Sequence, residues 1–392
     1  MSHSAASPLL GRTVTISGLG THVPARVVTN HDLSATLDTS DEWIRQRTGI
    51  VERRIAEPGV SSSDLGVAAA KAALADAGLD AEKVDLVITA SISPDQIMPA
   101  TAARVAYGCG CVHAGAFDVS AGCAGFVYAL AMAAGAVACG LHDNVLVVGA
   151  EAISRVIDWQ DRSTAILFGD GAGAVVVSPV KTSGAAGGGH AAGGDHGTRG
   201  GQAAGGEKRA SGTGASYAAR AETRCGILGF DLGGDGSGAD SLSIPAGGSR
   251  MPASQQTVED RQHYLHMNGK EVYKFATRVV THSAKRVLHR CGYEVVDIDL
   301  FVPHQANLRI IEGAVAKLGL PDHKVYTNLQ KYGNTSSASI PLCLYEARAD
   351  GRLRDGDLVL LMGFGAGLSW GACLMRWGMD AGGRYDKDDR SR

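Results

Sequence analysis

The sequence predicts a layered α/β fold, and three observations lead to this prediction. Helix-like and strand-like segments alternate along the chain, several of the strands are short and wholly apolar, and parts of the second half resemble parts of the first half in the same order. Short apolar strands are typical of a sheet that is covered on both faces. Their alternation with helices favours α/β layers over an all-α or an all-β protein.

The elements of the first half can be assigned in chain order. The predicted elements are a helix over 65–77, strands over 84–90 and 116–120, a long Ala-rich helix over 123–139 and a strand over 145–149. Residues 61–64 (SSSD) offer capping side chains just before the first helix, and Gly78 and Gly140 follow the ends of the two helices. Apolar runs of this length, bounded by glycine and polar residues, are typical of alternating buried strands and helices.

Two pairs of segments indicate that the fold is duplicated. Residues 83–88 (KVDLVI) follow a helix as residues 297–302 (DIDLFV) do later, and residues 168–175 (FGDGAGAV) resemble residues 364–369 (FGAGLS). Because the two matches occur in the same order, we predict two related α/β halves. The alternative is chance similarity between glycine-rich turns and valine-rich strands.

Residues 181–220 differ from the rest of the chain in composition. They hold 13 glycines and 10 alanines, and no Val, Ile, Leu, Met or Phe. Such a segment cannot bury enough apolar surface to offset its ordering entropy, so we expect a flexible insertion. The predicted division of the chain is an N-terminal half over 13–180, the insertion over 181–222, a C-terminal half over 223–378 and a polar tail over 379–392.

Composition and charge argue against several classes of protein. The 392 residues are 45% hydrophobic and 20% charged, with a net charge of −3, which is typical of a globular protein that binds neither nucleic acid nor a membrane surface. We read no secretory signal at the N-terminus, and the uncharged stretch over 119–141 is rich in Ala and Gly, which favours a buried core helix over a membrane span. The eight cysteines then indicate reduced thiols in the cytoplasm.

Three polar residues follow predicted strands. Cys123 lies between a strand and the Ala-rich helix, where the helix dipole favours a thiolate. His304 follows a strand in the segment VPHQAN, and Asn334 lies in the turn YGNTS beyond another predicted strand. Because ligands of open α/β sheets gather at the carboxyl ends of strands, we expect the three side chains to converge. Each also has a structural interpretation, as a buried thiol, a hydrogen-bonded core histidine and a turn residue.

These residues together supply a nucleophile and two polar hydrogen-bonding groups, a set compatible with acyl transfer and carbon–carbon bond formation. A cysteine can hold an acyl group as a reactive thioester, and His304 and Asn334 can donate hydrogen bonds to the oxygen of an enolate formed by decarboxylation. The glycine-rich segment over 363–371 is expected to supply a backbone N–H donor to the same carbonyl. Neither step needs a metal ion or a redox cofactor, and the pair Cys109-Gly-Cys111 is too closely spaced for a typical zinc site.

The sequence resembles the β-ketoacyl-acyl carrier protein synthase III family, the thiolase-fold enzymes that start type II fatty-acid synthesis. The resemblance runs from about Val14 to Trp377 without residues 181–220. The motifs that carry it are TSDEWIRQRTGI at 39–50, the segment around Cys123, DRSTAILFGDGAGA at 161–174, PHQANLR at 303–309 and GNTSSASIP at 333–341. The resemblance implies thiolase-like duplicated halves in an α-β-α-β-α architecture. It also implies condensation of an acyl-CoA with malonyl-acyl carrier protein by a ping-pong mechanism.

The resemblance implies roles for individual residues. Cys123 would be the acylated nucleophile, and His304 and Asn334 would assist decarboxylation and condensation. Lys274 and Arg309 fall where the family docks the acidic carrier protein, and Met98 falls where the partner subunit of a homodimer contributes to the acyl pocket. The channel for coenzyme A or pantetheine is implied to consist of Trp43, Arg47, Thr48, Arg162, Asn307 and Arg309.

One departure from the family pattern concerns the acyl pocket. The family's C-terminal loop is usually three glycines followed by Phe, whereas this chain has Gly365-Ala366-Gly367-Leu368. The added methyl group and the lost phenyl group change the pocket, so the departure bears on the choice of starter more than on the reaction.

The alternative functions are a starter-condensing enzyme or acyltransferase of secondary metabolism, a cysteine thioester hydrolase and a non-catalytic module that binds a carrier protein.

Overall fold

The computed structural model describes residues 11–180 and 225–378; the predicted insertion over 181–222 and the predicted tail over 379–392 lie outside them. The first half contains β1 (Val14–His22), β2 (Val27–Thr29), α1 (Asn30–Ser34), α2 (Asp41–Thr48), β3 (Glu52–Arg54), α3 (Ser62–Ala77), β4 (Leu86–Ala90), α4 (Thr101–Cys109), β5 (Gly115–Val119), α5 (Gly125–Ala138), β6 (Val145–Glu151), α6 (Arg162–Ala165) and β7 (Gly171–Pro179). The second half contains β8 (Gly226–Gly234), β9 (Leu242–Ser243), α8 (Gln255–Glu259), β10 (His266–Met267), α9 (Gly269–Cys291), β11 (Leu300–Pro303), α10 (Leu308–Leu318), α11 (Leu329–Tyr332), α12 (Ser339–Ala349), β12 (Leu358–Gly365) and β13 (Ser369–Arg376).

The two large sheets have the same topology. The first sheet has the order β1-β7-β6-β4-β5, and the second has the order β8-β13-β12-β11. In each sheet the first two pairings are antiparallel, and the third, β6 with β4 or β12 with β11, is parallel. Strand β5 extends the first sheet, whereas at the corresponding place in residues 225–378 a single bridge joins Phe301 and Val325. The shared strand order confirms the predicted duplication.

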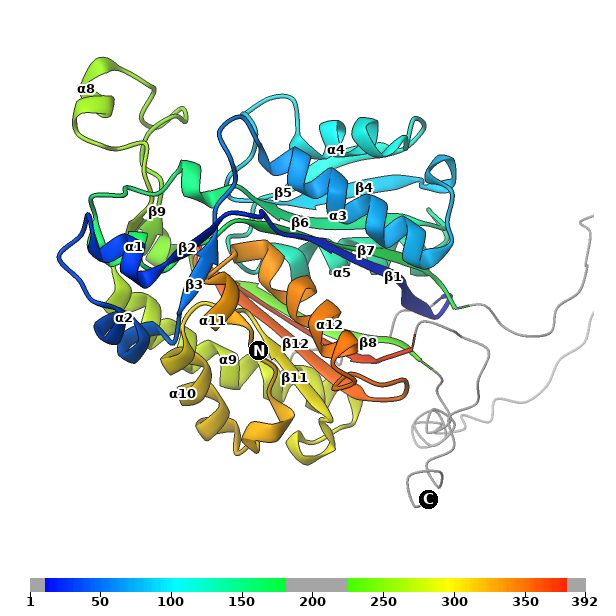
Figure 1. The fold of residues 1–392 in the computed structure, drawn as a ribbon. Helices are drawn as coiled ribbons and strands as arrows, with labels where there is room; N and C mark the ends of the chain where they lie inside the picture. The colour runs from blue at the N-terminus through cyan, green and yellow to red at the C-terminus, as the bar shows by residue number, and fades with distance from the viewer. Residues whose placement is uncertain (1–10, 181–224, 379–392) are drawn as a thin grey trace, which may run out of the picture. The chain divides into compact units, whose positions relative to one another are not determined.

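The helices and sheets alternate in five layers (Figure 1). Helices α3 and α4 cover the outer face of the first sheet, α5 and α12 lie between the two sheets, and α9 and α10 cover the outer face of the second sheet. Buried apolar side chains form one cluster on each outer face and one between the sheets. The predicted α-β-α-β-α architecture is therefore confirmed.

Small side chains allow the central layer to pack closely. Helix α5 is built largely from Ala, Gly and Val, and it contacts strands of both sheets. A Cβ atom added at Gly173 of β7 would lie 2.6 Å from Cβ of Pro341 in α12, so this contact requires glycine. The uncharged stretch over 119–141 is thus a core helix with its flanking turns. No helix in the described part of the chain is long and apolar enough to cross a membrane.

The predicted elements exist, with shifted ends. The helix predicted over 65–77 begins at Ser62, because Ser61 and Asp64 form a capping box. The strand predicted over 84–90 begins only at Leu86. The prediction that Asn334 follows a strand is wrong: it follows the short helix α11, which ends at Tyr332 and is capped by Gly333.

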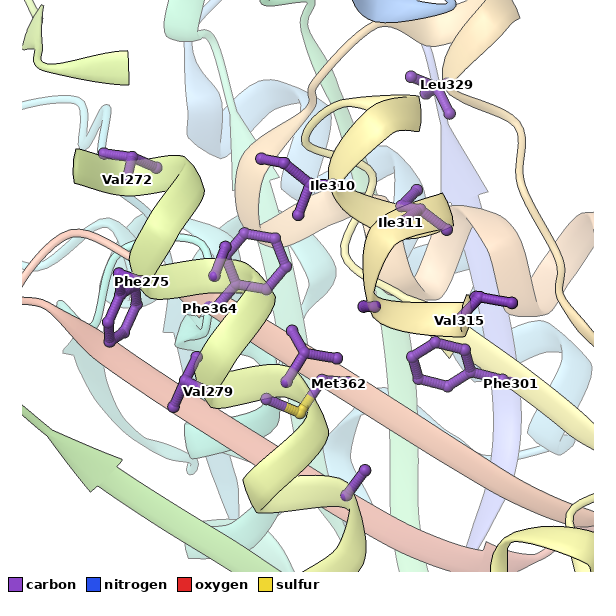
Figure 2. Close-up of a cluster of buried hydrophobic side chains, with 14 of the residues drawn as sticks. Val272, Phe275, Val279, Phe301, Ile310, Ile311, Val315, Leu329, Met362 and Phe364 are labelled. Atoms are coloured by element: carbon purple, nitrogen blue, oxygen red, sulfur yellow. The ribbon is translucent and has the colours of Figure 1, made fainter. Parts of the chain in front are cut away.

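The core of the second half reaches the histidine singled out in the sequence. Figure 2 shows part of the cluster on the outer face of the second sheet, with Val272, Phe275 and Val279 of α9, Ile310, Ile311 and Val315 of α10, Phe301 of β11, Leu329 of α11, and Met362 and Phe364 of β12. The ring of Phe364 also meets the imidazole of His304 edge-on, with 5.3 Å between ring centroids. The packed core therefore holds the ring against which His304 rests.

Candidate active site

One cavity of about 580 Å³ brings the three predicted catalytic residues together. Cys123, His304 and Asn334 line it and are nearly fully buried, with 5%, 1% and 5% of their surface exposed. Arg47 and Arg309 line the same cavity and are exposed. The buried residues therefore mark its inner end, and the two arginines mark the end that opens to solvent.

Cys123 is held between the end of β5 and the start of α5. Gly122 has a left-handed φ of +55°, and a Cβ atom there would lie 2.5 Å from the backbone nitrogen of Ala366. A Cβ atom at Gly365 would lie 2.4 Å from the nitrogen of Cys123. Both positions require glycine because the C-terminal loop packs backbone to backbone against the cysteine. This contact brings the Ala366 amide close to Cys123, as expected for the glycine-rich segment.

The environment of Cys123 favours a neutral thiol. Burial is the main cause that raises the pKa of Cys123 to about 12; the hydroxyl of Ser336 acts to lower it, and the carboxyl of Glu151 acts to raise it. From the sequence, the helix dipole is expected to favour a thiolate at Cys123, but burial raises the pKa of this thiol instead. The reason is that α5 begins two residues later, at Gly125, and the desolvation of a buried thiolate outweighs the dipole.

His304 lies directly after β11, as predicted. Its backbone N–H donates to the carbonyl of Met362 at 2.7 Å, and its Nδ1 lies 2.7 Å from the hydroxyl of Ser339. Burial lowers the pKa of His304 to about 3, so the imidazole is neutral. With Nδ1 engaged by Ser339, Nε2 is the ring nitrogen left for a ligand in the cavity.

Asn334 is fixed by both its backbone and its side chain. Its backbone N–H donates to the carbonyl of Leu167 at 2.8 Å, and its carbonyl accepts from the N–H of Gly169 at 3.1 Å. Its side-chain oxygen accepts the backbone N–H of Ser336 at 2.9 Å. Because the oxygen is committed, the side-chain NH₂ group is the donor that Asn334 can offer to a ligand.

The residues predicted to bind the outer part of a substrate fall into two groups. Arg47, Asn307 and Arg309 line the cavity, and Asn307 donates to the carbonyl of Arg47 at 3.0 Å. Trp43 lies beside them, because its ring is covered by the guanidinium groups of Arg47 at 5.5 Å and Arg162 at 4.9 Å.

Trp43 and Arg162 lie beside the cavity wall without lining it, and two more of the predicted binding residues, Thr48 and Lys274, do not line it either. Thr48 is buried, donates to the carbonyl of Ile44 at 2.7 Å and accepts from the N–H of Ile50 at 3.0 Å, so its hydroxyl is committed to ending α2. Lys274 is exposed on α9 and pairs with Glu271 at 2.9 Å.

Several residues of the site were not singled out in the sequence. Ser339 holds His304, and the carboxyl of Glu151 and the hydroxyl of Ser336 lie close to Cys123. Part of the cavity wall is apolar and comes from Leu242, Ile244, Leu265, Met267, Val272 and Ile310. One signal for Glu151 was present, since it is a charged residue that ends the otherwise apolar run VLVVGAE.

The described residues contain no group of three or more His, Cys, Asp or Glu side chains arranged to hold a metal ion. Cys109 and Cys111 are buried free thiols in the cluster between α3, α4 and the first sheet. Their burial raises the pKa of both thiols, which suits ordinary core residues.

Comparisons with known proteins agree with the resemblance seen in the motifs. The family models for 3-oxoacyl-[acyl-carrier-protein] synthase III and for the C-terminal part of that enzyme match residues 117–193 and 288–377. The chain is 50% identical over 367 residues to a β-ketoacyl-[acyl-carrier-protein] synthase III of Symbiobacterium thermophilum, a match that covers 94% of this chain and 99% of the relative. A corresponding enzyme of Caldanaerobacter subterraneus is 46% identical, with 92% and 97% of the two chains covered.

Solved structures give the same result for the fold. The synthase III of Thermus thermophilus is 44% identical, with a TM-score of 0.76 and coverage of 93% of this chain and 99% of that chain. A priming β-ketosynthase of the R1128 polyketide pathway is 36% identical, with a TM-score of 0.77 and coverage of 93% and 97%. The identity and the nearly complete coverage show that this chain belongs to the β-ketoacyl-[acyl-carrier-protein] synthase III family of thiolase-fold condensing enzymes.

Proposed function

We propose that this protein condenses an acyl-CoA starter with malonyl-acyl carrier protein, with loss of CO₂, through an acyl-Cys123 intermediate. The observation that carries the proposal is the convergence of one thiol and two side-chain donors at the buried end of a cavity whose open end is cationic. Coenzyme A and carrier-protein thioesters both have a long, uncharged pantetheine arm that ends in phosphate. A cavity with an apolar wall and arginines at its opening suits such a ligand.

In the first half-reaction, the sulfur of Cys123 forms a bond to the acyl carbon and the CoA thiolate leaves. The carbonyl oxygen of the acyl group becomes negative during this step and needs donors near Cys123. The backbone N–H groups of Cys123 and Ala366 are the proposed donors, because the glycine contacts at 122 and 365 hold the two backbones together.

In the second half-reaction, the malonyl thioester loses CO₂ and its enolate attacks the acyl carbon on Cys123. The negative charge of the enolate lies on the thioester oxygen. Nε2–H of His304 and the NH₂ group of Asn334 are the proposed donors to this oxygen. Donation from Nε2 requires that Nδ1 carry no proton, and the hydroxyl of Ser339 can donate to Nδ1 in this tautomer.

The outer residues are proposed to bind the nucleotide and phosphates of acyl-CoA. Trp43 offers an aromatic face between two guanidinium groups, and Arg47 and Arg309 offer charge at the open end of the cavity. Lys274, one residue after the cavity-lining Tyr273, would add charge for an acidic carrier protein. Thr48 would act only by ending α2 below Trp43 and Arg47.

Arg162→Ala is expected to raise the KM for acyl-CoA about tenfold while kcat changes little. The reason is that Arg162 would bind the part of the substrate that does not react, and this contact is equally strong in the ground state and the transition state. Arg45→Ala is the matched control, because Arg45 lies on the same helix as Trp43 and pairs with Asp41 at 2.8 Å. Steady-state kinetics with both variants test the assignment, and equal KM values for them would contradict it.

We also propose that the protein is a homodimer that pairs through β5. This strand is the last in the first sheet, and the neighbouring surface carries large apolar side chains. Ile97, Met98 and Tyr107 are 85%, 84% and 86% exposed, and Phe117 on β5 itself is 40% exposed. An apolar patch beside a sheet edge is a typical interface between subunits. In this dimer Met98 would reach the acyl pocket of the partner.

Tyr107→Glu is expected to raise the dimer dissociation constant at least about tenfold, because a charge would be buried in an apolar interface. Val296→Glu is the control, since Val296 is equally apolar and 72% exposed but lies in the second half. Sedimentation equilibrium over a range of protein concentrations measures both variants. A monomeric wild-type protein, or an unchanged dissociation constant in Tyr107→Glu, would refute the proposed interface.

The proposed reaction is tested by its products. Incubation with a panel of acyl-CoA starters and malonyl-acyl carrier protein should yield CO₂ and a carrier protein whose mass corresponds to the β-ketoacyl thioester. Hydrolysis of the starter without CO₂ release would instead indicate a thioester hydrolase, and absence of any acyl transfer would indicate a binding module. The 36% identical priming β-ketosynthase of a polyketide pathway favours one second candidate, a starter enzyme of secondary metabolism. The acyl-CoA starter that reacts fastest distinguishes an enzyme that starts fatty-acid synthesis from a starter enzyme of secondary metabolism.

A further inference from the structure

Ser336 is a strained and buried residue beside the cysteine. Its φ is +48°, and it is one of only two non-glycine residues with a positive φ among residues 11–180 and 225–378. The residue is fully buried, and in the described part of the chain its hydroxyl completes no hydrogen bond of good geometry. Strain and a buried polar group without a partner both cost stability, and they often coincide with functional sites.

Glu151 is a buried carboxyl group that, like Cys123, lies near Ser336. It is fully buried at the end of β6. Its partners are hydroxyl groups and backbone amides: it accepts from the N–H of Ile92 at 3.1 Å, from the hydroxyl of Ser93 at 2.6 Å and from the N–H of Ser337 at 3.3 Å. No lysine or arginine of the described residues pairs with it in an ion pair or hydrogen bond that would fix it as a permanent anion.

The turn that carries Ser336 joins this carboxyl group to the cysteine. The backbone N–H of Ser337 donates to Glu151, and its hydroxyl donates at 3.3 Å to the carbonyl of Gly122, the residue before Cys123. The hydroxyl of Ser336 lies close enough to influence the ionisation of both Cys123 and Glu151. Ser336, beside Ser337 in this turn, is therefore the residue whose hydroxyl is placed to connect the thiol and the carboxyl group.

We propose that Glu151 accepts the proton of the Cys123 thiol through the hydroxyl of Ser336 and holds this proton while Cys123 is acylated. The proposal rests on the proposed function, in which Cys123 forms the acyl-enzyme. Glu151 and Ser336 are positioning residues in this scheme, because neither touches the acyl group.

The proton balance of the relay closes over the two half-reactions. During acylation the S–H bond breaks, its proton goes to Oγ of Ser336, and the proton of Ser336 goes to Glu151. The electron pair of sulfur forms the bond to the acyl carbon, and the CoA thiolate leaves and takes a proton from solvent. During condensation the enolate displaces the sulfur as a thiolate, and Glu151 returns its proton through Ser336. The resting thiol is thereby restored.

The basicities of the buried groups favour Glu151 over His304 as the acceptor. Burial raises the pKa of Glu151 above its usual value, whereas burial lowers the pKa of His304 to about 3. A neutral imidazole with such a low pKa is the weaker base for a thiol whose own pKa is about 12. His304 then remains a donor for the enolate oxygen, as the proposed function requires.

Titratable groups lie near Glu151 on the elements around it. Glu151 acts electrostatically on Cys123. Asp95 follows its partner Ser93 by two residues, and Asp170 precedes Gly171, which pairs with Glu151 across the sheet. Asp95 is bound by Ser63, and Asp170 is bound by Ser154 and the N–H of Ala56. The reactivity of Cys123 should therefore follow the ionisation of Glu151: it is lost as the pH falls through the raised pKa of this carboxyl.

The test measures the rate at which Cys123 reacts with iodoacetamide and, separately, with acetyl-CoA, from pH 5.5 to 9, by intact-protein mass. Ser336→Gly removes the hydroxyl while glycine accepts the φ of +48° without strain, so the variant should fold. We expect both rates to fall about 10²-fold near neutral pH. The remaining rate should rise with pH along the ionisation of the thiol alone. Glu151→Gln should behave in the same way, and Glu151→Asp should keep part of the wild-type rate.

Asp170→Asn is the matched control, because Asp170 is also a buried carboxyl group bound by hydroxyl and amide donors. It should keep the wild-type pH profile. The relay is refuted if Ser336→Gly, folded as judged by its melting temperature, reacts at the wild-type rate, or if the rate falls equally at every pH. Failure of the proposed function looks different: acetyl-CoA would then leave Cys123 unmodified in the wild-type protein, although iodoacetamide still reports on the relay.

Discussion

Replacement of Cys123 by Ala is expected to abolish condensation and acyl-enzyme formation together, with turnover reduced on the order of 10⁴-fold or more. The physical reason is that the acyl group is to be held by a covalent bond to sulfur, and Cys123 is the one thiol among the described residues that line the cavity. Cys123→Ser should be nearly as inactive, since a buried hydroxyl is a far weaker nucleophile than a thiol. Intact-protein mass after exposure to acyl-CoA, followed by peptide mapping, measures the loss.

Stability provides the control for this variant. Cys123→Ala removes one sulfur atom from a buried site, and such a change typically costs on the order of 1 kcal/mol. The melting temperature should therefore change little while activity disappears. Cys111→Ala is the matched comparison, because Cys111 is also buried but lies in the cluster between α3, α4 and the first sheet. An acyl group found on a residue other than Cys123 would show that the nucleophile has been misassigned.

The convergence of Cys123 and His304 could be predicted from local sequence because each residue follows a recognisable strand. Apolar strands mark the chain before Cys123 and His304, and the two halves repeat one strand order. Asn334 was placed after a strand but follows the helix α11. It still reaches the site, because Gly333 lets the chain turn tightly against the carbonyl of Leu167.

The ionisation states of the site could not be predicted in this way. Whether Cys123 is a thiol or a thiolate depends on how completely the C-terminal loop covers it, and that loop is more than two hundred residues away in the chain. The same holds for Ser336 and Glu151, whose positions beside Cys123 arise only when the two halves pack together. From the sequence alone, Ser336 is a serine in a turn and Glu151 is an acid at the end of a strand. Their proximity to Cys123 is not visible at that level.

His304→Ala and Asn334→Ala are expected to separate the two half-reactions. Both residues are proposed to donate to the enolate oxygen, and loss of one donor to a developing oxyanion typically lowers the rate by about 10² to 10³. Each variant should therefore still accumulate acyl-Cys123 but release little CO₂ from malonyl-acyl carrier protein. The neutral state of His304, whose pKa burial lowers to about 3, supports a donor role over that of a base for the thiol.

Two measurements on the same folded variants decide this assignment. Acylation is followed by intact-protein mass, and decarboxylation is followed by release of labelled CO₂. Ser339→Ala extends the test to His304, because the loss of its hydroxyl beside Nδ1 should weaken the tautomer that donates from Nε2. Its effect should again fall on decarboxylation and not on acylation. An equal loss of both steps in His304→Ala, at an unchanged melting temperature, would instead identify His304 as the base that activates Cys123 and would remove the need for Glu151.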